Sequence, residues 1–452
     1  MKQHQQYKKM IETPIGKLIA TMSIPTIISM LVTSVYNMAD TFFVSKLGTS
    51  ASGAVGIVFS LMAVIQALGF TFGMGSGSWI SRLLGAKDTE QSKEVAASAF
   101  YATLLLGVLL TIVGKWKLDE LMMILGASET ILPYAKEYAE FILLAAPVMA
   151  ASFVLNNILR SEGHAKFAMV GITVGGVLNI ALDPLLIFTF HMGIKGAAVA
   201  TALSQLISFL ILLSYFIFGK TTTRLGFRRI SKKPGIYMQI IKNGLPSFSR
   251  QGLASAASIL INQQAMVYGD AAVAAIAIVS KIFMMIFSVM IGFGQGYQPV
   301  VGYNYGANMM TRVKKSVKFT LWVGIFGMSV AALGVFVAAP WLLGLFVSDD
   351  PKVLEIGTIA LRAQALSMPL IPIGTVANMT FQSVGKAWTA TVMSSMRQGI
   401  FYIPLVMILP RMLGLWGVVS TQAAADVFTA LSCAPFLWSF YKKIEVKEED
   451  KK

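Results

Sequence analysis

The sequence predicts an all-α integral membrane protein in which twelve transmembrane helices form two pseudo-symmetric six-helix lobes. Of the 452 residues, 56% are hydrophobic and only 13% are charged, whereas an average soluble domain has about a quarter of its residues charged. Apolar runs long enough to cross a bilayer recur along the whole chain, and the landmarks of the first half recur in the second. Together these observations predict a duplicated, polytopic fold.

Each predicted helix corresponds to an apolar run of about 20 residues or more, the length that spans a bilayer. The polar start MKQHQQYKKM precedes a run that is itself long enough to span, so we expect a retained first helix and not a cleaved signal peptide. Because the number of helices is even, both termini lie on one side. The helices are expected at 16–44, 52–80, 95–114, 132–159, 166–190, 195–218, 241–268, 271–303, 317–346, 354–383, 388–410 and 414–440.

The basic residues explain the net charge of +16 and orient the chain. Most Lys and Arg fall in the N-terminus, the alternate loops on its side, and the C-terminus, so the positive-inside rule makes both termini cytoplasmic. Nucleic acid is therefore not an expected partner. The densest basic stretch is the expected cytoplasmic linker, at 220–240, between an N-lobe at 1–219 and a C-lobe at 241–452 with a short charged tail. The lone Cys433 excludes a disulfide framework and a cysteine-based metal cluster.

The two halves repeat each other at an offset of about 221 residues. Pro25 has its counterpart in Pro246, and Gly193 has its counterpart in Gly414. Since each half has six helices, both halves share one topology across the membrane. In transporters built from such repeats, binding sites lie between the repeats, and one half rocks against the other.

Asp40 and Asp183 lie inside apolar helices of the first half only. Their counterparts in the second half are Ile261 and Leu405. A helix rises 1.5 Å per residue, and this places both aspartates and Thr201 at a similar depth in the outer half of the membrane. Carboxylates at such depth are costly and commonly relay protons or bind cations.

Polar neighbours share the helix faces of the two aspartates. Tyr36 and Asn37 precede Asp40 by about one turn, and Asn179 precedes Asp183 by four positions. Two carboxylates with an amide and a hydroxyl would suit a small cation or a shared proton. The alternative is that both aspartates only hold neighbouring helices together through hydrogen bonds.

Prolines are expected to disrupt two of these helices. Pro184 has no N–H to donate and so frees the carbonyl of Ile180, and Pro25 can act in the same way early in the first helix.

The chain resembles the multidrug and toxic compound extrusion (MATE) family, closest to its bacterial DinF-like branch. The resemblance covers nearly the whole sequence and implies a transporter of two six-helix lobes that exports amphipathic drugs in exchange for H+ or Na+ by alternating access. The motifs that carry it are Pro25…Tyr36-Asn37-x2-Asp40-x2-Phe43-x3-Leu47-Gly48, Ser81-Arg82-Leu83-Leu84-Gly85-Ala86-Lys87-Asp88, and Leu178-Asn179-x3-Asp183-Pro184-x2-Ile187.

The same resemblance implies a cation site in the N-lobe. Four positions match the family's ion-binding residues, namely Asp40, Asn179, Asp183 and Thr201. Tyr138 and Asn156 also match N-lobe residues of the family as supporting or substrate-facing groups. The implied mechanism is that ions neutralise the aspartates, the first helix bends near Pro25, and the N-lobe cavity shrinks and releases the drug.

In the C-lobe, the seventh helix departs from the other main branch of the family. That branch has a cation-binding glutamate on this helix, where this chain has Gln263 and Gln264. A C-lobe ion site of that type is therefore not expected.

Three charged residues of the C-lobe are expected near mid-membrane, namely Lys281, Arg397 and Asp426. One interpretation is a satisfied structural ion-pair network. The other is a positively charged C-lobe that tolerates zwitterionic or anionic cargo.

Other classes of protein fit the sequence poorly. Gly219-Lys220-Thr221 has Ser214 where a phosphate-binding loop needs glycine, which argues against an ATPase. The three histidines fall in the tail and in loops on opposite sides, so no enzyme is expected. The strongest rival is a lipid-linked precursor flippase of the same superfamily. We expect no cofactor beyond H+ or Na+, small amphipathic organic substrates, and a monomer surrounded by lipid in the bacterial cytoplasmic membrane.

Overall fold

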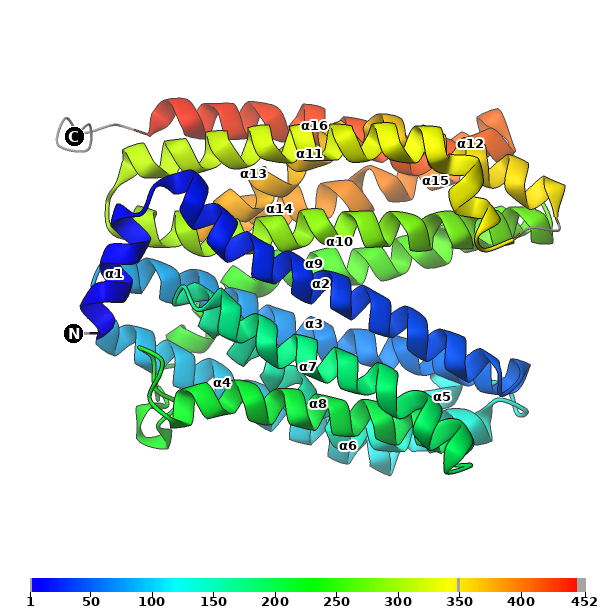
Figure 1. The fold of residues 1–452 in the computed structure, drawn as a ribbon, viewed down its shortest axis with the longest axis horizontal. Helices are drawn as coiled ribbons and strands as arrows, with labels where there is room; N and C mark the ends of the chain where they lie inside the picture. The colour runs from blue at the N-terminus through cyan, green and yellow to red at the C-terminus, as the bar shows by residue number, and fades with distance from the viewer. Residues whose placement is uncertain (1, 348–349, 445–452) are drawn as a thin grey trace.

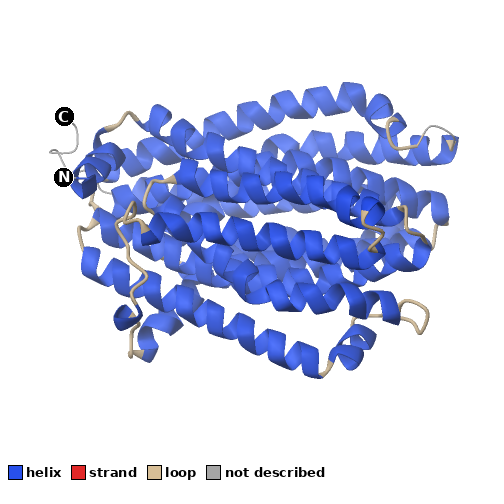
Figure 2. Cartoon of the chain, turned by 60° about the horizontal axis from the view of Figure 1, so that its bottom comes forward, coloured by secondary structure: helices blue, strands red, loops and turns tan. Residues whose placement is uncertain are grey.

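Long helices run side by side along one axis of the molecule, and short loops join them at its two ends (Figures 1 and 2). This computed structural model describes residues 2–347 and 350–444, and helices are the only regular secondary structure in these ranges. The first half contains α1 (Lys2–Glu12), α2 (Ile15–Ser45), α3 (Thr49–Gly85), α4 (Thr89–Trp116), α5 (Leu118–Ile124), α6 (Leu132–Ser161), α7 (Ala165–Pro184), the π-helical turn η1 (Leu185–Thr189) and α8 (Gly193–Ile217).

The second half begins after a linker that carries a single 3-10 turn. Its elements are η2 (Phe227–Arg229), α9 (Pro234–Met266), α10 (Asp270–Gly306), α11 (Met310–Gly344), α12 (Pro351–Ser367), the 3-10 turn η3 (Met368–Leu370), α13 (Ile371–Ser383), α14 (Ala387–Ser395), the π-helical turn η4 (Met396–Ile400), α15 (Tyr402–Leu413) and α16 (Leu415–Lys443). In Figure 1, α1 and the end of α16 lie at the same end of the bundle.

The predicted all-helical membrane fold is confirmed. Within the described ranges, eleven helices are long and apolar enough to cross a membrane when helices continued through η1, η3 and η4 are counted as one. The remaining predicted helix, the seventh, corresponds to α9, which has 33 residues but is less apolar, because it carries Arg250, Gln251 and Ser255, which line a central cavity. It begins at Pro234, within the stretch expected as linker, since proline suits the first turn of a helix.

Two short helices were not predicted. The polar start of the chain forms α1, and its last turn buries Met10 completely. The loop between α4 and α6 contains α5, which buries Met122. Both helices are too short to span a bilayer, so a search for apolar runs does not find them.

Equivalent positions of the two halves have the same local geometry. Asn156 donates a hydrogen bond to the carbonyl of Ala168 at 3.0 Å, and Asn378 donates one to Ala390 at 2.8 Å. A positive φ also recurs in pairs, at Gly48 and Gly269, Gly163 and Gly385, and Gly193 and Gly414. The repeat in the sequence is therefore a repeat in structure.

The two halves meet most closely at the end of the bundle where α1 lies. A Cβ atom on Gly75 of α3 would collide with the backbone of α9 near Gly244, and one on Gly296 of α10 would collide with Ser23 of α2. The Ser23 hydroxyl donates a hydrogen bond to the carbonyl of Phe293 at 3.0 Å. Backbones that approach this closely require glycine, as is common in packed membrane helices.

Helix α1 and its following turn connect both halves at this end. Gln6 donates a hydrogen bond to the carbonyl of Glu162 in the first half at 2.8 Å. Arg312 of the second half donates one to the carbonyl of Thr13 at 2.6 Å. Arg82 of α3 adds a direct contact between halves, donating to the carbonyl of Ser383 at 2.7 Å. This end of the interface is therefore sealed by backbone packing and by hydrogen bonds.

The linker is held to the same end by the buried Glu162 side chain. Its carboxylate accepts hydrogen bonds from the Thr222 N–H at 2.7 Å, the Thr223 N–H at 2.9 Å and the Thr223 hydroxyl. His164 lies 3.8 Å from this carboxylate, but burial lowers the pKa of His164 to about 4, so the contact is not an ion pair at neutral pH. Burial raises the pKa of Glu162 from 4.5 to about 7.

The raised pKa of Glu162 predicts that the contact between its side chain and the linker weakens as pH rises. A carboxyl that binds its proton more tightly when buried favours the buried state at low pH, and this advantage is lost as pH rises from 4.5 to about 7. Hydrogen exchange corrected for intrinsic rates is expected to show stronger protection of the Thr222 and Thr223 amides at pH 6 than at pH 8. Glu162→Gln is expected to remove this dependence, and the exposed Glu129→Gln is expected to retain it. An unchanged pH dependence in Glu162→Gln would contradict this account.

Candidate functional site

The structure brings the two predicted aspartates together in the interior of the first half. Asp40 on α2 and Asp183 on α7 are only 4% and 0% exposed, and α2 packs against α7. The Asn179 amide donates hydrogen bonds to Asp183 Oδ1 at 3.4 Å and to Thr201 Oγ1 at 3.2 Å. Three helices, α2, α7 and α8, therefore meet at these four residues.

Tyr138 on α6 is part of the same cluster. Its hydroxyl donates a hydrogen bond to Asp40 Oδ2 at 3.4 Å, and its side chain is fully buried. Asn156 of the same helix lies elsewhere, because its amide is bound to the Ala168 carbonyl of α7. The structure thus places Tyr138 at the aspartates and Asn156 away from them.

Several buried oxygen atoms of this cluster, and one that follows it on α8, have no hydrogen-bond partner. They are Asp40 Oδ1, Asn179 Oδ1, Asp183 Oδ2 and the hydroxyl of Ser204. Within residues 2–347 and 350–444, no Lys, Arg or His forms a salt bridge with either aspartate. Because an unpaired buried carboxylate is costly, these oxygens suit a bound proton or a cation that prefers oxygen ligands.

Ser204 is a buried polar residue of the cavity wall next to this cluster in the sequence of α8, and it was not predicted. It follows Thr201 by three positions on α8 and is 2% exposed. Residues three apart share one face of a helix, so the spacing from Thr201 was the signal that could have found it.

The prolines have different local surroundings. Pro184 ends α7 and is followed directly by the π-helical turn η1, so the helix is irregular next to Asp183. Pro25 lies inside the continuous helix α2, where it leaves the carbonyl of Thr21 without its helical donor. The predicted irregularity is therefore present at Pro184, and α2 remains helical through Pro25.

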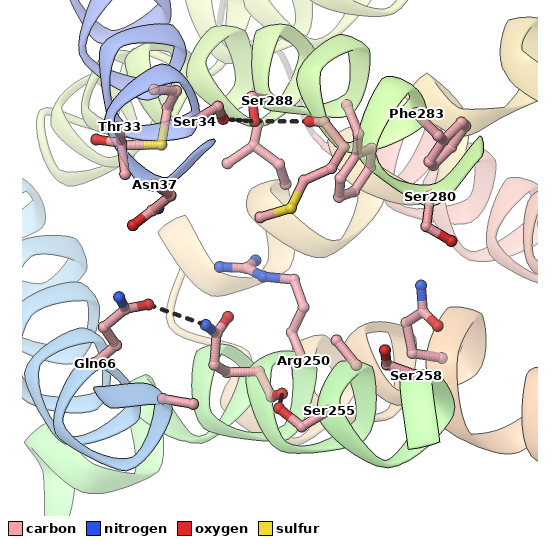
Figure 3. Close-up of a pocket in the computed structure, with 18 of the residues that line it drawn as sticks. Thr33, Ser34, Asn37, Gln66, Arg250, Ser255, Ser258, Ser280, Phe283 and Ser288 are labelled. Atoms are coloured by element: carbon pink, nitrogen blue, oxygen red, sulfur yellow. Dashed lines mark hydrogen bonds between the residues drawn. The ribbon is translucent and has the colours of Figure 1, made fainter. Parts of the chain in front are cut away.

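A cavity of about 970 Å³ lies between the two halves. Figure 3 shows it between two pairs of helices, with Asn37 and Arg250 directed into it. Ser34 of α2 and Ser288 of α10 are hydrogen-bonded at 2.8 Å on one side, and Gln251 of α9 donates to Gln66 of α3 at 3.4 Å on the other.

The aspartate cluster lies directly behind the wall of this cavity. Asn179, Thr201 and Ser204 line the cavity, whereas Asp40 and Asp183 do not. The polar side chains that contact the aspartates therefore separate them from the cavity. Among the other predicted residues, Tyr36, Asn37 and Asn156 also line it.

The three charged residues predicted to cluster in the C-lobe separate into a pair and a single residue. Arg397 Nε lies 2.6 Å from Asp426 Oδ1, and Gln422 and Ser367 donate further hydrogen bonds to this carboxylate at 3.1 and 3.4 Å. Lys281 makes no ion pair or hydrogen bond within the described part of the chain and lines the cavity. Arg397–Asp426 is thus a satisfied ion pair, and Lys281 lines the same cavity as these two residues without joining the pair.

No second carboxylate site occupies the equivalent place in the second half. The counterparts of the aspartates are the apolar Ile261 and Leu405. Among the described residues, no group of three or more His, Cys, Asp or Glu side chains is arranged to hold a metal ion.

A duplicated helical bundle with a cavity between its halves and a buried carboxylate pair behind the cavity wall defines a membrane transporter built from structural repeats. The MatE family model matches the chain twice, at residues 25–185 and 246–408. The chain therefore belongs to the MATE family of transporters and is not an enzyme. Each matched stretch lies within one half of the fold.

Individual relatives are similar over nearly their full length. Multidrug export protein MepA of Staphylococcus haemolyticus is 29% identical, with 96% of each chain covered. MepA of Staphylococcus aureus strain MRSA252 is 28% identical with the same coverage.

Solved structures of MATE transporters have the same fold. A MATE in complex with MaL6 superposes with a TM-score of 0.92 at 28% identity, covering 97% of this chain and 98% of that one. An outward-facing multidrug resistance MATE transporter of the MOP superfamily gives 0.91 at 28% identity, covering 96% and 98%.

Proposed function

We propose that this protein is an antiporter that exports small amphipathic organic compounds in exchange for H+ or Na+. The observation that carries the proposal is the pair of buried carboxylates, Asp40 and Asp183, with unpartnered oxygens next to the cavity between the lobes. The relatives named as multidrug export proteins support efflux of varied organic compounds. The protein acts as a monomer in the cytoplasmic membrane of a bacterium.

The arrangement of seal and cavity corresponds to an outward-facing state. The halves are sealed at the end where α1 and the linker lie, and the positive-inside rule assigns this end to the cytoplasm. Cavity-lining residues of α2 run from Met30 to Asn37, farther along the helix than the sealing contact at Ser23. The cavity is thus on the extracellular side of the seal.

In this state an ion reaches the aspartates from outside, past the polar side chains of Asn179 and Thr201. Binding neutralises the carboxylates and changes the hydrogen bonds that Asn179 and Tyr138 make to them. Because Asn179 and Thr201 also line the cavity, the ion alters the substrate's surroundings and promotes release. Rocking of the lobes then breaks the cytoplasmic seal and delivers the ion inside.

The test is gradient-driven transport by the purified protein in liposomes. A cationic, a zwitterionic and an anionic dye are each loaded, and an inward H+ gradient and an inward Na+ gradient are applied separately. We expect one of the two ions to drive efflux of at least one dye. Efflux that needs neither gradient, or no efflux of any dye under either gradient, would contradict the antiport proposal.

The same liposomes separate drug export from the rival prediction of a lipid-linked precursor flippase. A flippase would move a fluorescent polyprenyl pyrophosphate between leaflets and leave soluble dyes inside. An antiporter would export the soluble dyes and would not move the polyprenyl pyrophosphate between leaflets.

A further inference from the structure

The charged groups that line the cavity are predominantly basic. Among the described lining residues, the bases are Arg160, Arg250, Lys281 and Arg397, and the one acid is Asp426. Arg397 and Asp426 neutralise each other at 2.6 Å. Three positive charges therefore remain without a carboxylate in the cavity wall.

Two of these cations come from different helices of the second half, α9 and α10. Figure 3 shows the Arg250 guanidinium of α9 extending into the space between the two hydrogen-bonded helix pairs. Lys281 comes from α10, and its side chain is exposed in the cavity. Within the described residues, neither side chain takes part in a salt bridge.

The third cation, Arg160, lies on the last turn of α6 and is 4% exposed. Its guanidinium donates to the side-chain oxygens of Gln295 and Asn157, which are neutral, and its Nε has no partner. Arg160 thus contributes a buried, uncompensated charge where the first half meets α10.

Cations without a counter-charge in a cavity wall suit an anionic ligand, and the alternative is that water in the cavity simply hydrates each of them. It is adequate for Lys281, whose flexible chain can extend into water. It is less adequate for Arg160, because a buried charge is costly without a counter-charge. A cleft lined by one sign of charge between low-dielectric walls also concentrates its potential and attracts ions of opposite sign.

We propose that the cavity selects amphipathic organic anions and zwitterions, and that Arg250 and Lys281 bind the acidic group. This inference rests on the proposed transport function and assigns its substrate class. Arg160 adds positive potential from the sealed end of the cavity. The apolar part of the substrate packs against aromatic and methionine side chains of the wall, which include Phe59, Phe70, Phe283, Phe287, Met30 and Met284. Flexible methionines accommodate varied shapes.

A matched pair of dyes tests the charge preference. Fluorescein and rhodamine 123 share a xanthene ring system but have opposite charge. Binding is measured by fluorescence anisotropy on the purified full-length protein in phosphatidylcholine nanodiscs. We expect fluorescein to bind at least about tenfold more tightly than rhodamine 123.

Three variants test the assigned residues. Arg250→Gln and Lys281→Gln are each expected to weaken fluorescein binding about tenfold, the effect of losing one charge-assisted contact, while rhodamine 123 binding is unchanged or tighter. Lys242→Gln is the matched control, because Lys242 is an exposed base of α9 that does not line the cavity. Lys281 is exposed, so its replacement leaves the packed core intact.

Equal affinity for the two dyes, tighter binding of rhodamine 123, or no loss in either cavity variant would overturn the proposal. The acidic group could also belong to a lipid, so phosphatidylglycerol is added to the nanodiscs in a second arm. If this lipid displaces fluorescein from the unmodified protein but not from Arg250→Gln, the anion site binds a lipid headgroup. If the lipid does not displace fluorescein, the site binds a soluble anion. Gradient-driven efflux of rhodamine 123 without fluorescein binding would contradict this substrate preference but would still support antiport. Fluorescein binding without any coupled efflux would support the preference and contradict antiport.

Discussion

Replacing either aspartate by asparagine is expected to reduce gradient-driven dye efflux to the rate of protein-free liposomes. Asparagine keeps the size of the side chain but cannot release or bind a proton, and its neutral oxygen is a weaker ligand for Na+. The effect is expected to be complete for Asp183→Asn, because Asp183 is fully buried and contacts Asn179, which reaches the cavity wall. Asp40→Asn is expected to have a similar effect. Efflux is followed under whichever ion gradient drives the unmodified protein.

Asp270→Asn is the control for these two variants. Asp270 is an exposed carboxylate in the first turn of α10 and does not line the cavity. It should retain full efflux. Dye binding should persist in all three variants, since neither Asp40 nor Asp183 lines the cavity. Coupled efflux by Asp183→Asn at the unmodified rate would show that the aspartates only bind helices together.

Gly244→Leu is expected to prevent the cytoplasmic seal from forming. A Cβ at this position would collide with the backbone of Thr71 on α3, and backbone cannot move aside as a flexible side chain can. Overpacking at a close interface destabilises it by about 1–3 kcal/mol or more. Here the substitution destabilises only the sealed state, in which α3 and α9 are in contact. The equilibrium should therefore shift toward an inward-facing state, and transport should be lost.

The shift can be measured by labelling Ser258→Cys from outside the cell with a membrane-impermeant maleimide. Ser258 lines the cavity, and the native Cys433 is buried, so background labelling is low. Labelling should fall sharply when Gly244→Leu is added. Gly252→Leu on the same helix has open space around it and should label as before. Equal labelling in both glycine variants would mean that the close contact at Gly244 does not control the seal.

Hydropathy and the repeat predicted most of the fold because lipid exposure forces long apolar runs. They describe α9 less well, since Arg250 and Gln251 lower its hydropathy for a reason that appears only when the cavity is known. The short helix α1 was not predicted, because its polar residues give no apolar run, although its Met10 is fully buried.

The buried carboxylate cluster was predicted better than the cavity. Asp40 and Asp183 stand out in sequence because charge is rare in such helices, and their shared depth follows from helix geometry. The contact between Tyr138 and Asp40 depends on how α6 packs against α2, which no local spacing reveals. Likewise, sequence alone grouped Lys281 with Arg397 and Asp426 by depth, but depth does not say which face of α10 the lysine occupies.

Antiport requires that ion and substrate compete, and this can be measured directly at equilibrium. Dye is added to the purified protein in a weakly buffered or 22Na+-containing solution, and released H+ or 22Na+ is counted against dye bound. We predict that binding of dye releases one kind of ion, and that Asp183→Asn binds dye without releasing any. Dye binding to the unmodified protein with no release of either ion, or the same release from Asp183→Asn, would contradict the assignment of Asp40 and Asp183 as the coupling site.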